Sequence, residues 1–183
     1  MSDRMRKALH DGGNQIGQRE AGAMRRKQVK TIIGYYSGIP GMVKLLNSER
    51  LDLEDEYNGL RGTSYDGMPH GSTPGKPTEE LAVRMDTERT WARIQEIDVK
   101  KQVLQGDAAI IRDCLDALNS KYKSLVCMKY LNGYSWAKIS VSLGVPDGTI
   151  RRWNDRAIER LGELLDEAPM AWEILGRASR ARV

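Results

Sequence analysis

The sequence predicts an all-α protein in which a long helical arm precedes a small C-terminal bundle that contains a helix-turn-helix. Apolar residues recur every three or four positions between residues 29 and 60, and four helical patterns follow one another after residue 106. A compact Gly-Val-Pro-Asp-Gly break separates the last two of these patterns. With 183 residues, 40% of them apolar, the chain can form about one ordinary core with extensions.

Charge is unevenly distributed along the chain, although its sum is small. Lys and Arg number 29 and Asp and Glu 25, giving a net charge of +4, yet eight basic residues and only three acids lie within residues 1–30. Residues 1–24 lack apolar periodicity, so we expect a basic, disordered tail there. Because the sequence has no apolar run of about 18 residues and starts without a signal-peptide pattern, we expect a cytoplasmic protein with no membrane partner.

The residue types that catalysis and metal binding require do not occur in suitable patterns. Cys114 and Cys127 lie in apolar helical patterns, and the two cysteines and two histidines lack the paired short spacings of a structural zinc site. We therefore expect two reduced thiols, no metal and no cofactor. Since no nucleophile–base pair or phosphate-binding Gly loop appears either, we predict that the protein is not an enzyme.

The helical arm is expected over residues 25–61. Its apolar stripe alternates spacings of three and four, which is typical of a heptad pattern with one polar exception at Arg50. Pro40 interrupts the pattern without changing its phase, which predicts either a kink or a brief break between two helices. The arm can form a hairpin with the next helix or a coiled coil between chains. The stripe consists of Val29, Ile32, Tyr36, Ile39, Val43, Leu46, Arg50, Leu53, Tyr57 and Leu60.

A linker and a second long helix follow the arm. Residues 62–77 are rich in Gly, Pro and Ser and are not periodic, so we expect a flexible connection. Residues 78–105 are expected to form the second long helix, with Thr78 as its N-cap and acidic residues in its first turn. Its apolar face is expected to include Ile94, Ile97 and Leu104.

The C-terminal bundle is expected over residues 106–168. Gly106 is interpreted as the end of the second long helix, with Asp107 and Ser120 as N-caps of the next two helices. Gly133 is expected in a left-handed conformation after them. The bundle continues with a short helix capped by Ser135 and ends with a long helix; residues 169–183 are expected to form a C-terminal tail.

The last two helices have the pattern of a helix-turn-helix. Gly144 provides a permissive turn, Val145 can fill the angle between the helices and Pro146 fixes the start of the second helix. Asp147 or Thr149 can satisfy its first amides. Ile150 and Trp153 are expected to hold this recognition helix to the core while its other face stays open to DNA. The candidate DNA-binding residues are Ser135, Lys138, Thr149, Arg151, Arg152, Asp155 and Arg156.

From spacing alone, the same segment could be an ordinary helical hairpin with a solvated arginine face instead of a DNA-binding helix-turn-helix. A family resemblance favours the helix-turn-helix. The segment "LNSKYKSLVCMKYLNGYSWAKISVSLGVPDGTIRRWNDRAIERLGELL" resembles the promoter-reading fourth region of bacterial sigma factors. It departs from the family pattern at Ser140, where Gly or Ala is usual, and at Pro146, where Ser or Thr is usual. The shared positions are Tyr130, Gly133, Ser135, Ile139, Leu143, Gly144, Thr149, Ile150, Arg156, Ala157 and Leu161.

The order of arm, flexible segment, helix and sigma-like module is similar to that of ArpU/RinA-type phage regulators, which activate late or packaging genes. The resemblance spans roughly residues 28–166 and implies promoter binding and transcriptional activation in a bacterial host cell. It implies double-stranded DNA as a partner and contact with bacterial RNA polymerase. A homo-oligomer is also expected, because a single small helix-turn-helix buries little surface on DNA. A small terminase subunit and a polymerase-bound antiterminator remain alternative functions.

Overall fold

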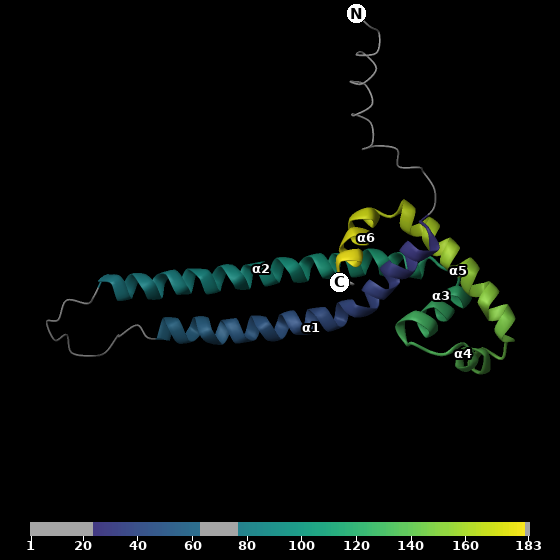
Figure 1. The fold of residues 1–183 in the computed structure, drawn as a ribbon, viewed down its shortest axis with the longest axis horizontal. Helices are drawn as coiled ribbons and strands as arrows, with labels where there is room; N and C mark the ends of the chain where they lie inside the picture. Colours follow the sequence, from purple (N-terminus) through teal and green to yellow (C-terminus); the bar gives the residue numbers. More distant parts are fainter. Residues whose placement is uncertain (1–23, 63–76, 182–183) are drawn as a thin grey trace, which may run out of the picture.

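The computed structural model describes residues 24–62 and 77–181, and this part of the chain consists of helices joined by short turns, with no strand (Figure 1). The all-α prediction is therefore confirmed. The predicted tail and linker lie almost entirely outside the described residues. In chain order, the elements are α1 (Arg26–Gly62), α2 (Pro77–Asp116), α3 (Ser120–Val126), the π-helical turn η1 (Cys127–Leu131), α4 (Trp136–Leu143), α5 (Asp147–Glu167) and α6 (Ala171–Arg180).

Helices α1 and α2 form an antiparallel hairpin that projects from a bundle of shorter helices (Figure 1). The apolar stripe of α1 faces α2: Leu53 is buried together with Ile94 and Ile97 of α2. Arg50, the polar exception in the stripe, binds Asp98 of α2 with 3.1 Å between Nε and Oδ1. The stripe therefore packs within one chain, as the hairpin alternative predicted.

Pro40 does not break α1, which is one helix from Arg26 to Gly62. Figure 1 shows that α1 bends in its N-terminal half. A proline inside a helix removes one backbone hydrogen bond and pushes away the preceding turn, and Pro40 is the proline that α1 contains. Of the two predicted outcomes at this position, the kink is the one observed.

The first turns of α1 belong to the core of the bundle as well as to the arm. Val29, Ile32 and Ile33 are fully buried, in the same core as Ile158 and Leu161 of α5. The sequence pattern suggested a separate arm and bundle, but these residues join them. Helices α3, α4 and α5 together are small and bury little apolar surface, and α1 covers the side of α5 that would otherwise face water.

The predicted helix boundary at Gly106 and Asp107 is wrong. Helix α2 continues through both residues to Asp116, and Gly106 is not among the glycines with positive φ. Asp107 is buried instead of capping a helix: its Oδ2 accepts hydrogen bonds from Tyr35 Oη at 2.8 Å and from Arg177 Nε at 2.7 Å. Because Asp107 bonds side chains of α1 and α6, its carboxylate does not cap a helix, and α2 continues past it.

The expectation of a C-terminal tail over residues 169–183 is also wrong for the described residues. Helix α6 follows α5 and packs on the core through Ala171, Ile174 and Ala178, which are all buried. Arg177 on the same helix forms the ion pair with Asp107 of α2. The bundle thus has a further helix that is held by an apolar face and by one charged contact.

Two residues that were predicted as N-caps, Ser120 and Thr78, lie inside their helices. Asn119, not Ser120, caps α3, and its Oδ1 accepts a hydrogen bond from Lys121 N at 3.1 Å. Helix α2 begins at Pro77, before the predicted cap Thr78.

Among the described helices, none has both the length and the apolar character of a membrane span.

Candidate nucleic-acid interface

The two ends of α4 have the geometry that the sequence predicted. Ser135 caps α4, where its Oγ accepts a hydrogen bond from Lys138 N at 3.2 Å. Gly144 ends α4 in the left-handed region with φ 62°, a conformation that L side chains rarely adopt. The hydroxyl of Ser140, which departs from the sigma pattern, donates to Val145 O at 2.6 Å. Ser140 therefore fastens the turn from the side of α4.

A second, small core holds α4 and α5 against α3. Leu125, Ile139 and Ile150 are fully buried at its centre, one from each of the three helices. Trp153 packs at the edge of this core and is only partly buried, although the sequence suggested that it faces inward. The surrounding side chains are Met128, Tyr134, Trp136, Leu143, Val145 and Trp153.

The predicted recognition helix, α5, keeps its outer face open to solvent. Arg151, Arg152, Asp155 and Arg156 are exposed, and Thr149 is partly exposed. Residues three and four apart share one face of a helix, so Arg152, Asp155 and Arg156 lie together on the outer side of the first three turns of α5. This is the face that a helix-turn-helix presents to the major groove.

The exposed arginines of α5 differ in their contacts. Arg151 Nε donates to Asp147 Oδ2 at 2.9 Å, and its guanidinium lies 5.5 Å from the centre of the Trp136 ring. In the part of the chain that the structure describes, no ion pair engages Arg152 or Arg156. These two arginines can therefore bind phosphates or base edges without first leaving a partner.

The expected capping of α5 by Asp147 or Thr149 is not observed. The N-cap position is Pro146, and no side chain bonds the first amides there. Asp147 instead pairs with Arg151, which lies one turn later. Both side chains are about half exposed, so the pair is weak and Arg151 can still turn toward DNA.

Three lysines that surround the helix-turn-helix lie over aromatic rings. Lys121 Nζ is 3.2 Å from the centre of the Trp153 ring, and Lys138 Nζ is 3.6 Å from that of Tyr134. Lys129 Nζ lies 4.6 Å from the ring of Trp136. A lysine over an aromatic face is held in place by the ring, and Lys129 Nζ also donates to Tyr134 O at 3.2 Å.

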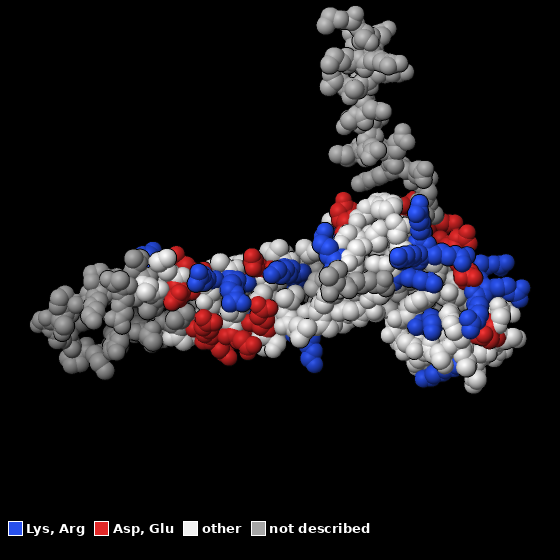
Figure 2. Space-filling view, in the orientation of Figure 1, with Lys and Arg blue, Asp and Glu red and all other residues white. Residues whose placement is uncertain are grey.

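On the face drawn in Figure 2, Lys and Arg gather over the bundle, whereas basic and acidic residues lie side by side along the arm. Lys138 is among the residues that the sequence suggested for DNA binding, whereas Lys121, Lys129 and Arg26, which also lie around the helix-turn-helix, are not. Arg26 Nη1 lies 3.0 Å from Asp155 Oδ1 of α5. The sequence could have pointed to both lysines, because Lys121 is on α3 and Lys129 on η1, the two elements directly before α4. It could not have pointed to Arg26, because the contact joins residues that are 129 positions apart.

The cysteines have no features of a reactive or metal-binding site. Burial raises the pKa of both Cys114 and Cys127, so the thiols stay protonated at neutral pH. The Cys114 thiol donates to the carbonyl oxygen of Leu164, with 3.7 Å between Sγ and O. Within the described ranges, no three His, Cys, Asp or Glu residues are placed to hold a metal ion.

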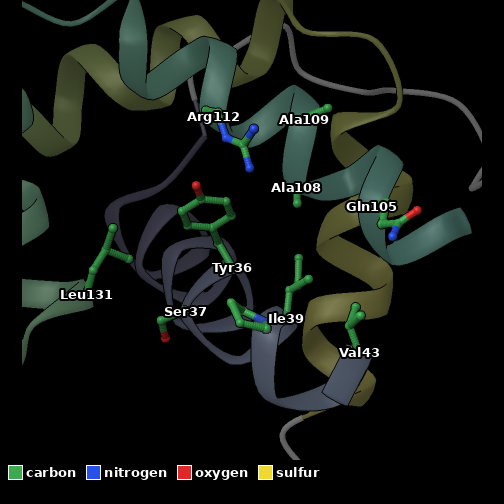
Figure 3. A pocket seen from close by; sticks show the side chains of 10 residues that line it. Tyr36, Ser37, Ile39, Val43, Gln105, Ala108, Ala109, Arg112 and Leu131 are labelled. Atoms are coloured by element: carbon green, nitrogen blue, oxygen red, sulfur yellow. The ribbon is translucent and has the colours of Figure 1, made fainter. Parts of the chain in front are cut away.

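A groove of about 800 Å³ lies between α1 and α2, beside the bend in α1 (Figure 3). Its walls are mostly apolar, and Arg112 is the charged residue among those that line it. The hydrogen bond to Tyr36 raises the pKa of Arg112 above its ordinary value. The lining residues are Tyr36, Ser37, Ile39, Pro40, Val43, Gln105, Ala108, Ala109, Arg112 and Leu131.

Comparison with known proteins agrees with this geometry. Residues 108–161 match the family described as Sigma-70, region 4, from the last turns of α2 to the middle of α5. The match spans less than a third of the 183 residues. Neither the curated proteins nor the solved structures contain a match to the chain. Residues 108–161 thus form a helix-turn-helix of the sigma region 4 type, which is a DNA-binding type found in regulators of transcription.

Proposed function

We propose that this protein is a sequence-specific transcriptional regulator that binds promoter DNA by inserting α5 into the major groove. The observation that carries the proposal is the outer face of α5, where Arg152 and Arg156 are exposed on a helix that two cores hold in place. Arginine at such a position can bind guanine edges with two hydrogen bonds or pair with phosphates. The family match over residues 108–161 supports the same use of this helix.

The proposal extends to activation of phage late or packaging genes, through contact with bacterial RNA polymerase. Its support is the similarity of the domain order to the ArpU/RinA-type regulators, and the sigma region 4 character of residues 108–161. A regulator with this domain would sit at a promoter in place of, or beside, the corresponding part of a sigma factor.

Self-association through the arm is the third part of the proposal. The heptad stripe is occupied by α2, so a second chain would have to bind the outer surfaces of the hairpin. Large apolar side chains are exposed there: Leu45 is 72% exposed on α1, and Val99 is 59% exposed on α2. Dimers of helix-turn-helix proteins bind paired half-sites, which compensates for the small surface that one module buries.

The function is tested by footprinting the full-length protein on DNA from its own genome. The proposal predicts protected sites with a shared sequence immediately upstream of transcription start points, and transcription from these promoters should rise when the protein is added with polymerase. Protected sites at a packaging sequence, with no effect on transcription, would instead favour a small terminase subunit. Activity that appears only with a downstream terminator would favour an antiterminator.

The arm is tested by analytical ultracentrifugation of a Leu45→Asp/Val99→Asp variant. Because both side chains are exposed, these changes should lower the sedimenting mass without unfolding the hairpin. The matched control is Lys44→Asp, a change at an exposed polar position next to Leu45. An oligomer that persists in the double variant, or a monomeric wild type, would remove the arm from this role.

A further inference from the structure

We propose that the first turns of α1 form one edge of the DNA-binding surface, where Arg26 contacts a phosphate next to the groove that α5 occupies. The inference rests on the proposed function, since it concerns DNA bound to α5. It assigns a DNA-binding role to a part of the chain that lies outside residues 108–161, the segment that matches the sigma family.

The start of α1 is seated closely on α5. A Cβ atom added at Gly162 would lie 3.0 Å from Met24 O and 3.3 Å from Val29 Cγ2, so the absence of a side chain at Gly162 permits this approach. Met24 and Val29 are themselves buried. The first turns of α1 therefore have a fixed position relative to the recognition helix.

Arg26 lies on the exposed side of this contact. Its Nη1 is 3.0 Å from Asp155 Oδ1, and the two side chains are 60% and 53% exposed, so the pair lies at the surface. Asp155 is three residues after Arg152 and directly before Arg156 on α5. Lys30 is one turn after Arg26 and is exposed as well, which places both cations on one side of α1.

The position of Asp155 along α5 indicates which part of DNA this edge would meet. A recognition helix contacts base edges with its N-terminal residues, and later turns leave the groove beside the sugar-phosphate backbone. Asp155 is in the third turn of α5, which begins at Asp147. Arg26, which pairs with Asp155 from α1, is therefore suited to contact a phosphate and not a base.

The negative charge of Asp155 at this edge would oppose DNA binding without a cation beside it. Asp155 alone would repel a phosphate, and Arg26 cancels that charge while the guanidinium keeps further N–H donors for an anion. The first turn of α1 contains no acidic residue, and Arg25, Arg26 and Lys27 are all exposed. Basic residues are unfavourable at the start of a helix because of its dipole, so helix stability does not account for this cluster.

The test measures binding of the full-length protein to a 30-base-pair duplex of mixed sequence by fluorescence anisotropy, over a range of salt concentrations. One phosphate contact contributes about 0.9 to the slope of log affinity against log salt. For Arg26→Ala, affinity should therefore fall less steeply with salt, by about one unit of slope. The ratio of wild-type to variant affinity should be about eight times larger at 0.1 M salt than at 1 M salt. The melting temperature of Arg26→Ala should stay close to that of the wild type, since exposed ion pairs stabilise little.

Two further variants make the result specific. Lys44→Ala removes an exposed cation from the arm part of α1 and should leave both affinity and slope unchanged. In an Asp155→Asn background, Arg26→Ala should weaken binding less than it does in the wild type, because the repulsive carboxylate is gone. A slope for Arg26→Ala equal to those of the wild type and Lys44→Ala would overturn the inference.

Failure of the inference and failure of the proposed function give different results. If the wild type protects specific sites but Arg26→Ala binds the mixed duplex as well as the wild type does, only the role of α1 is wrong. If the wild type binds no duplex at any salt concentration, both are wrong.

Discussion

Replacing Arg177 by methionine tests whether α6 is part of the folded bundle. The side chain of Asp107 is only 3% exposed, and Arg177 supplies two of its hydrogen bonds, from Nε at 2.7 Å and from Nη2 at 2.5 Å. Its partner carboxylate raises the pKa of Arg177 above the ordinary value, which agrees with a favourable pair. Methionine keeps much of the aliphatic contact but leaves the carboxylate with the Tyr35 hydroxyl as its remaining side-chain donor among residues 24–62 and 77–181.

The size of the effect follows from the burial of the two groups. Removing one partner of a buried ion pair costs roughly 3 to 5 kcal/mol. Arg177 is 24% exposed, so water can partly replace it, and we expect a loss of about 2 to 4 kcal/mol in the free energy of unfolding. Urea denaturation at neutral pH, followed by circular dichroism, measures this loss. Arg180→Met, an exposed change on the same helix, is the control. A loss below about 1 kcal/mol for Arg177→Met would refute the reasoning.

Three further predictions concern Tyr35 and two glycines, Gly106 and Gly162. Burial, together with the Asp107 carboxylate, raises the pKa of Tyr35 to about 12, from about 10 in the unfolded chain. The contribution of Tyr35 to the free energy of unfolding should therefore be fully present below pH 10 and should fall by up to roughly 3 kcal/mol as the pH rises to 12. Urea titrations at several pH values should show a smaller fall for Tyr35→Phe. Gly106→Ala should stabilise the protein by about 0.5 to 1 kcal/mol if α2 is continuous there, since a Cβ meets no atom within 4 Å, whereas a helix end at Gly106 would make the change destabilising. Gly162→Ala should lower the melting temperature, because its Cβ would lie 3.0 Å from the Met24 carbonyl oxygen; an increase would show that α1 can move away from α5.

The sequence was most informative where structure is decided by neighbouring residues. The heptad stripe predicted that α1 packs along its length against another helix, and both Gly133 and Gly144 have the positive φ that their positions after helices indicated. Ser135 caps α4 as predicted. These features depend on spacing and on backbone sterics, which a single sequence displays directly.

The prediction failed where distant residues decide the structure. Gly106 followed by Asp107 has the local pattern of a helix end and a cap, yet Asp107 bonds Arg177, 70 positions away, and α2 continues. Helix α6 is short, and its buried face has only three positions. Their spacings of three and four residues, at Ala171, Ile174 and Ala178, were the one signal that could have revealed this helix.

For the candidate site, the pattern gave the exposed face of α5 but not the contacts of each side chain. Arg152 and Arg156 are exposed as expected, whereas Arg151 is exposed but pairs with Asp147. The pairing of Asp155 with Arg26 depends on how α1 packs against α5, which the periodicity of neither helix encodes.

The central claim is that the outer face of α5 reads a DNA sequence. It is tested most directly by titrating wild-type protein and Arg152→Ala against a footprinted site and against a mixed-sequence duplex at physiological salt. Arg152 is exposed, so the variant should fold normally, bind the site about tenfold or more weakly and bind mixed DNA almost unchanged, because a bidentate arginine–guanine contact contributes roughly 1 to 3 kcal/mol of discrimination. If Arg152→Ala, Thr149→Ala and Arg151→Ala all bind the site as tightly as the wild type, α5 is not the element that reads it.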